Sequence, residues 1–346
     1  MVSDREAEDL GNEPVDANEQ RKSPLLVIGV ILTAAVGGAF AIRMLAPAPP
    51  ASTPAARPIV QIVRQQAGLP DLSDMIDRLC PSLAAIGQVG DGSAMPIPAF
   101  AVSTDGWLLT AAPIKDGVPK AAFGDGRTAT LSDVRTDPVS GLSIARADAL
   151  TIQPLPFVDQ PFPRVGQFGV ALRTPAGSGC SASTGMIASD FLADGRGLVG
   201  YVRAQAISSD WANGLPFVGS DGRVIGVDVD AKGTLIPGPL ASSIVDELIR
   251  NSLSPSTNFG FRVIDFTPPI STRLGSTRSG AGIALVQAKS AAARSGLEAG
   301  DIVIAVNDEP VSSASEVNRA VDAIDKSGTM SVIRGDQQLT IAIARS

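Results

Sequence analysis

Short runs of apolar residues, separated by turn signals, fill the chain between about residues 82 and 230. The apolar runs are Ala99–Val102, Trp107–Leu109, Leu142–Ala145, Gly169–Leu172, Leu198–Val202 and Val224–Val229. Glycine-containing turns stand between them, at Asp105-Gly106, Gly124-Asp125-Gly126, Asp194-Gly195 and Asp221-Gly222. Regularly spaced short strands joined by such turns are typical of a β-barrel or a β-sandwich. The pattern therefore predicts a mainly β domain.

Helices are predicted at both ends of this domain. A short amphipathic helix is predicted at 71–79, before the first strand. A second is predicted at Gly238–Asn251, where the apolar residues that share one face are Leu240, Ile244, Leu248 and Ile249. The first globular domain is therefore predicted at 71–251, and SLSPST at 252–257 is interpreted as a linker.

The last segment, 258–346, mixes strands with short helices. NFGFRVIDF is predicted to be a strand, SAAARSGLEAG a short helix ended by glycine, and DIVIAVNDEPV two strands joined by a turn. Ser313 and Glu316 have the spacing of a capping box before a helix. Its apolar positions, three or four residues apart, are Val317, Ala320, Val321 and Ile324. MSVIRGDQQLTIAIA is predicted to form a closing hairpin.

One long apolar segment stands near the start of the sequence. Residues 25–42 include a single polar side chain, Thr33, and at about 1.5 Å per residue they nearly span a hydrocarbon core of about 30 Å. A buried core helix or a cleaved signal peptide is the alternative, but an acidic stretch precedes this segment and a proline-rich one follows it. We therefore predict a transmembrane helix at 25–45 and an extended Pro/Ala-rich linker at 46–70. Arg21 and Lys22 favour a cytoplasmic N-terminus.

The charge of the chain is concentrated in its first 24 residues. The formal net charge is −7, and residues 1–24, a predicted cytoplasmic tail, carry seven acids against three bases, or −4. The remainder is mildly acidic and has no basic stripe, which argues against a nucleic acid as partner.

Two residue types limit the chemistry. The sequence contains no histidine, which excludes every mechanism that uses imidazole as a base or a metal ligand. Its two cysteines, Cys80 and Cys180, cannot form a zinc site by themselves, so no metal is predicted. A disulfide between them is allowed outside the cytoplasm. Two separately buried free thiols are the preferred interpretation.

The C-terminal segment resembles a PDZ domain of the bacterial HtrA (DegP-like) type. The resemblance rests on NFGF at 258–261, on AARSGLEAGDIVIAVNDEPV at 292–311 and on the helix that follows. It implies that a peptide adds as a strand and that backbone N–H groups near NFGF capture its C-terminal carboxylate. The peptide-binding residues implied are Asn258, Phe259, Gly260, Phe261, Val317 and Val321. The alternative is that these phenylalanines and valines only form the core.

The middle domain resembles the protease domain of the same family. The matching stretches are DGWLLTAAPI at 105–114, DPVSGLSIARAD at 137–148, STGMIAS at 183–189 and ANGLPFVGSDGRVIGV at 212–227. The resemblance implies a trypsin-like double β-barrel followed by an α/β PDZ domain. The family's catalytic His, Asp and Ser fall on Pro113, Gly141 and Asn213, and an oxyanion-hole glycine falls near Trp211. None of these residues can act in a Ser-His-Asp site.

Three functions remain open at this point. The preferred interpretation is an inactive HtrA-like pseudoprotease, anchored in a bacterial inner membrane with its domains in the periplasm. It would bind protein or peptide C-termini, use no cofactor, and assemble with an active HtrA-like homologue. The second is a secretion or assembly adaptor of the GspC type. The third is a hydrolase with an unrecognised site, such as a dyad of Ser208 or Ser209 with Lys115, or an acid pair of Asp137 and Asp210.

Overall fold

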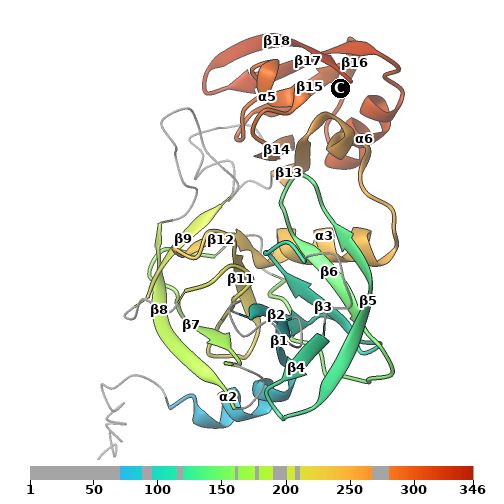
Figure 1. Cartoon of the computed structure of the whole chain (residues 1–346). Coiled ribbons are helices and arrows are strands. Elements are labelled where there is room, and N and C mark those ends of the chain that lie inside the picture. Colours follow the sequence, from blue (N-terminus) through green and yellow to red (C-terminus); the bar gives the residue numbers. More distant parts are fainter. Residues whose placement is uncertain are drawn as a thin grey trace, which may run out of the picture. The chain divides into compact units, whose positions relative to one another are not determined.

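The computed structural model describes residues 71–87, 96–114, 120–159, 163–175, 179–189, 201–206, 211–266 and 280–345 (Figure 1). The predicted tail at 1–24, transmembrane helix at 25–45 and linker at 46–70 lie outside these residues. Among the described residues, no helix is long and apolar enough to cross a membrane.

The first β-barrel is closed by six strands in the order β1-β2-β3-β6-β5-β4. They are β1 (Leu83–Gly87), β2 (Ile97–Ala101), β3 (Trp107–Thr110), β4 (Lys120–Phe123), β5 (Thr128–Thr136) and β6 (Ser143–Ala147). The α-helix α2 (Ser73–Leu79) and the 3-10 helix η1 (Cys80–Ser82) lead into β1 and match the helix predicted at 71–79. All four residues of β3 are buried, so this strand shows no apolar–polar alternation.

The second barrel is closed by six further strands, in the order β10-β11-β12-β9-β8-β7. They are β7 (Phe168–Arg173), β8 (Ser181–Ser189), β9 (Val202–Ala206), β10 (Pro216–Val218), β11 (Val224–Asp228) and β12 (Thr234–Pro237). Helix α3 (Gly238–Ile249) follows and buries the face that was predicted, except that Ile249 is only partly buried. The prediction of a mainly β domain is therefore confirmed, and so is the double β-barrel that the family resemblance implied.

The third part of the fold is a sheet with the strand order β13-β14-β15-β17-β18. The strands are β13 (Phe261–Phe266), β14 (Gly280–Val286), β15 (Ile302–Val306), β17 (Ser327–Arg334) and β18 (Gln337–Ala344), and β16 (Glu309–Pro310) pairs with β15. Helices α5 (Ala291–Arg294) and α6 (Ala314–Asp322) pack on it. Among the strands that the structure describes, β13 pairs with β14 alone, so its other edge is an edge of the described sheet.

The connection between the barrels and this sheet is not the simple linker that was predicted. Pro255–Phe259 forms a 3-10 helix, η2, in which Ser256 and Thr257 are buried. The Ser256 N–H donates to Oδ1 of Asn318 on α6. Strand β13 consequently begins at Phe261 rather than at Asn258, because η2 takes up the preceding residues.

The capping box before α6 is present in modified form. The Ser313 hydroxyl accepts the N–H of Glu316, as predicted. The Glu316 carboxylate, however, accepts the N–H and the hydroxyl of Ser312 instead of the N–H of Ser313. A further donor at this helix end, the Ala314 N–H, donates to the carboxylate of Asp265 on β13 at 2.6 Å.

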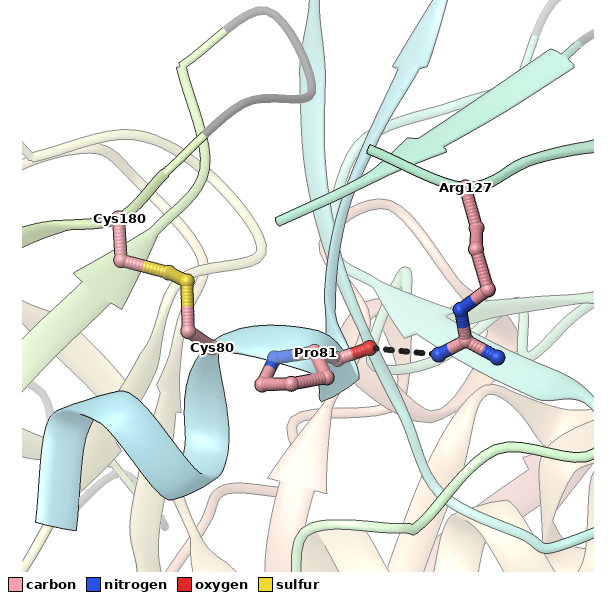
Figure 2. Close-up of a disulfide and its surroundings, with 4 residues drawn as sticks. All are labelled: Cys80, Pro81, Arg127 and Cys180. Carbon is pink, nitrogen blue, oxygen red and sulfur yellow. Dashed lines mark hydrogen bonds between the residues drawn. A yellow bond between two sulfur atoms is a disulfide. The ribbon is translucent and has the colours of Figure 1, made fainter. Parts of the chain in front are cut away.

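The preference for two free thiols is wrong, because Cys80 and Cys180 form a disulfide with a Cα–Cα separation of 5.8 Å (Figure 2). Gly124 brings the two cysteines together: a Cβ there would lie 2.8 Å from the Cys80 sulfur, and its carbonyl accepts the Gly179 N–H at 3.0 Å. The sequence did not reveal this proximity, because the cysteines are 100 residues apart.

Candidate functional site

The three positions matched to a catalytic triad lie in loops around one buried residue, Thr110, at the end of β3. Pro113 follows Thr110 by three residues and is exposed. Gly141, also exposed, stands two residues before Ser143, which pairs with Thr110. Asn213 precedes Gly214, where a Cβ would lie 2.5 Å from the Thr110 hydroxyl. The fold therefore brings the Gly214 turn of the second barrel against the end of β3 in the first.

Asn213 itself is partly buried, and its side-chain oxygen has no hydrogen-bond partner. The neighbouring Trp211 stacks on Phe217 of β10, with 5.8 Å between the ring centroids. Gly214 adopts the left-handed conformation, with φ 93°, which suits glycine. The described part of this loop, 211–215, is thus a tight turn packed against the first barrel, and it contains no side chain that can act as a nucleophile.

Most of the alternative catalytic residues lie outside the part of the chain that the structure describes. Ser208, Ser209, Asp210 and Lys115 lie outside the described residues. Asp137, the other member of the acid pair considered, is fully buried and already bonded to an arginine. No described contact supports a hydrolytic site built from these groups.

The Arg262 side chain connects the PDZ segment to the first barrel. It is the second residue of β13, its Nε and Nη2 donate to Asp137 at 3.0 and 2.9 Å, and its Nη1 donates to Glu247 of α3 at 3.0 Å. The relative exposures of the three side chains are 4%, 0% and 12%. Burial lowers the pKa of Arg262, but the two carboxylates outweigh this effect and raise it above its ordinary value.

This ion cluster has further support on both sides. The Ser140 N–H and hydroxyl donate to Asp137, and the Ser254 N–H and hydroxyl donate to Glu247. Burial, together with the negative charge of Asp137, raises the pKa of Tyr201 to about 12.

Apolar residues of the PDZ segment also contact the barrels: Leu285 and Ala284 of β14 join the apolar cluster formed between the two barrels. The ion cluster of Arg262, Asp137 and Glu247 was not predicted, although the arginine in the otherwise apolar strand start FRVI indicates a buried charge.

The residues predicted to bind a peptide are gathered beside η2 and α6. Phe259, Phe261, Val317 and Val321 belong to one buried cluster, and none is more than 1% exposed, whereas Asn258 is exposed. In this closed arrangement, the last side chain of a peptide would have to part β13 from α6 in order to enter.

The Gly260 backbone is held by the chain itself. Its N–H donates to the Thr257 carbonyl at 3.0 Å, and its carbonyl accepts the Gln287 N–H at 2.8 Å. Gly260 adopts φ 83°, and a Cβ there would collide with the Ser290 side chain. Gly260 was predicted from the sequence to bind a peptide, but its contact with Ser290 already requires a glycine at this position.

A buried carboxylate in the second barrel holds the loop that contains Asn213. The Asp228 side chain accepts the N–H groups of Asp230, Ala231 and Gly233 at 2.7 to 2.9 Å, and its backbone bonds to Gly214 and Leu215. Burial raises the pKa of Asp228 to about 6, because desolvation of the charge outweighs these hydrogen bonds.

This shift predicts a pH dependence of stability. The pKa of Asp228 is higher in the folded protein than in the unfolded chain, so the folded state holds the proton more tightly. The resulting stabilisation is fully present below the unfolded value of 3.8 and is lost as the pH rises through about 6. The free energy of unfolding of wild type minus that of Asp228→Asn should therefore fall by roughly 3 kcal/mol from pH 3.5 to 7. Urea unfolding of both proteins at each pH measures this difference. A difference that rises with pH would show that the three N–H donors dominate instead.

Two closed barrels joined to a PDZ-like α/β unit define a class of protein, the PDZ-containing proteins of trypsin-like fold. The PDZ domain family model matches residues 282–334. A probable periplasmic serine endoprotease DegP-like of Bartonella henselae is 25% identical over 235 residues, which cover 64% of this chain and 47% of that protein. Its counterpart in Halomonas elongata is 26% identical and covers 70% and 55%.

The putative serine protease HhoA of Synechocystis is 24% identical over 377 residues and covers 91% of this chain and 95% of that protein. The solved HtrA-type protease AlgW with a tripeptide shares the fold, with a TM-score of 0.50, 19% identity and coverage of 80% and 97%. The chain is therefore similar in sequence to HtrA/DegP-like serine proteases, and its residues 282–334 match a PDZ domain. It spans about half the length of the Bartonella and Halomonas relatives.

Proposed function

We propose that this chain is a catalytically inactive HtrA-like protein, anchored in the inner membrane, that binds protein or peptide C-termini in the cell envelope. One observation carries the inactivity: the chain has no histidine, and Pro113, Gly141 and Asn213 stand at the triad positions. Proline and glycine offer no side-chain proton acceptor, and an asparagine amide is no nucleophile at neutral pH. The loss of all three functions together argues against a partly working site.

The scaffold around these positions supports a retained binding role. The Gly214 turn lies against Thr110 of the first barrel, and the backbone of the buried Asp228 holds this turn in place. The two closed barrels also favour this function over a secretion adaptor of the GspC type, which was considered because it needs only an anchor, a linker and a PDZ domain. Assembly with an active HtrA-like homologue remains part of the proposal.

The PDZ domain is the proposed binding module. One edge of its strand β13 pairs with no other described strand, and a peptide that adds there obtains backbone hydrogen bonds along β13. Asn258, Phe259, Gly260 and Phe261 would face the peptide's C-terminus, and Val317 and Val321 its last side chain. The proposed compartment is the periplasm, since the Cys80–Cys180 disulfide suits an oxidising environment and the Bartonella and Halomonas relatives are named periplasmic.

The proposal predicts binding without cleavage. Decapeptides that end in Val, Leu, Ile or Phe on a Gly/Ser background are made with a free C-terminal acid and with an amide. At least one acid should bind the full chain, in detergent, about 10-fold or more tightly than its amide, because the carboxylate hydrogen bonds are charge-assisted. Fluorescence anisotropy measures the binding, and mass spectrometry follows the same peptides and added unfolded casein.

Two outcomes would contradict the proposal, one its peptide binding and the other its lack of catalytic activity. If no acid peptide is preferred over its amide, the PDZ domain does not read C-termini. If casein is cleaved by wild type and a single substitution abolishes the cleavage, the chain is a hydrolase with a site that the triad positions do not include. An active HtrA protease assayed in parallel controls for the state of the casein.

A further inference from the structure

The loop that would receive a peptide carboxylate is short of one donor. Among the backbone N–H groups of this loop, that of Gly260 already donates to the Thr257 carbonyl, and Phe259 belongs to the 3-10 helix η2. A carboxylate has two oxygens that can each accept more than one hydrogen bond. A further donor, preferably a cation, is therefore needed if this loop is to hold a carboxylate.

Such a cation lies beside the loop. The guanidinium carbon of Arg345 is 5.7 Å from the centroid of the Phe259 ring. Arg345 directly follows β18, and its N–H donates to the Lys326 carbonyl at 2.9 Å, which fixes its backbone. The residue is exposed, and none of the described salt bridges includes it. Its charge is thus held next to Phe259 without a carboxylate of the described chain to neutralise it.

We propose that Arg345 is the cationic part of the carboxylate site, so that peptides with a free C-terminus are held jointly by the loop at 258–261 and by this side chain. An arginine stacked on an aromatic ring keeps the N–H groups at its edge free for bidentate bonds to a carboxylate. The Phe259 ring is itself buried and therefore offers a fixed surface for stacking. This inference rests on the peptide binding proposed above.

The experiment compares Arg345→Ala, Arg345→Lys and wild type as full chains in detergent, with the same acid and amide decapeptides. Arg345→Ala should weaken binding of the acid peptides about 10- to 100-fold and leave the amides unchanged, so that the acid-to-amide preference collapses. Arg345→Lys should restore part of the preference, because it keeps the charge without the planar fork. Arg250→Ala, which removes an exposed cation after α3, is the matched control and should change affinity less than 2-fold.

The outcomes separate this inference from the proposed function. If wild type prefers acids and Arg345→Ala keeps the preference, Arg345 is not part of the site, while peptide binding stands. If wild type binds no acid peptide, both proposals are wrong. Equal circular dichroism spectra of wild type and Arg345→Ala ensure that a collapsed preference reports the lost charge, and raising NaCl should weaken acid binding more in wild type than in this variant.

Discussion

Replacing Arg262 with methionine should lower the free energy of unfolding of residues 68–346 by about 3–5 kcal/mol. Removal of one partner from a buried ion pair leaves the other charge buried and unpaired, and here Asp137 is fully buried and Glu247 largely so. The size of the effect does not mean that the cluster adds this much net stability. Removing three charges from water is itself costly, and in the intact cluster the attraction between the charges offsets this cost. Without Arg262 the cost of burying the two carboxylates is no longer offset.

The same variant should also uncouple the unfolding of the barrels from that of the PDZ domain. Both tryptophans of the chain, Trp107 and Trp211, lie in the barrels, so their fluorescence reports barrel unfolding, whereas circular dichroism reports all strands and helices. In wild type the two signals should change together in guanidinium chloride. In Arg262→Met they should separate, because the PDZ domain is then attached mainly through Leu285, Ala284 and η2.

Two further variants test the assignment to the ion cluster. Arg250→Met removes an exposed arginine and should cost less than about 0.5 kcal/mol. The double variant Arg262→Met with Asp137→Asn should be more stable than the sum of the single effects predicts, because the buried charge is gone. Strict additivity of the two substitutions would mean that Arg262 and Asp137 do not interact in solution.

The parts of the fold that depend on local pattern were predictable from the sequence. The helix at Gly238–Asn251 and the hairpin formed by β17 and β18 were predicted, because apolar periodicity and turn residues determine them within a short window. The division of the β domain into two closed barrels came only from the family resemblance. Period and spacing alone do not distinguish a barrel from a sandwich, since both bury one face of each strand.

The features that depend on contacts between distant segments were not predictable. Arg262 and Asp137 are 125 residues apart, and Cys80 and Cys180 are 100 residues apart. Arg345 was overlooked because its position beside Phe259 depends on β18 ending next to η2, which no local signal indicates. The carboxylate loop was predicted because NFGF at 258–261 resembles that of PDZ domains, but the hydrogen bond from the Gly260 N–H to the Thr257 carbonyl was not predicted. Sequence thus identified the candidate site, whereas tertiary contacts decide which donors are free.

Loss of the Cys80–Cys180 disulfide should be the other large effect. In the chain-entropy description, a cross-link that closes a loop of about 100 residues stabilises the folded state by about 4.7 kcal/mol, because it restricts the unfolded chain. Cys80→Ser with Cys180→Ser should therefore lower the free energy of unfolding by about 2–5 kcal/mol. Wild type treated with dithiothreitol should approach the same value, which separates loss of the bond from loss of the sulfur atoms.

A neighbouring substitution provides the control for this experiment. Arg127→Ala removes the exposed side chain that donates to the Pro81 carbonyl at 3.4 Å, one residue from the disulfide (Figure 2). It leaves the cross-link intact and should cost about 1 kcal/mol or less. Because the disulfide ties the segment before β1 to the start of β8, its loss should loosen the contact between the barrels, which also carries the loop with Asn213. If dithiothreitol and the double substitution leave the unfolding midpoint unchanged, the two cysteines are not bonded in the folded protein.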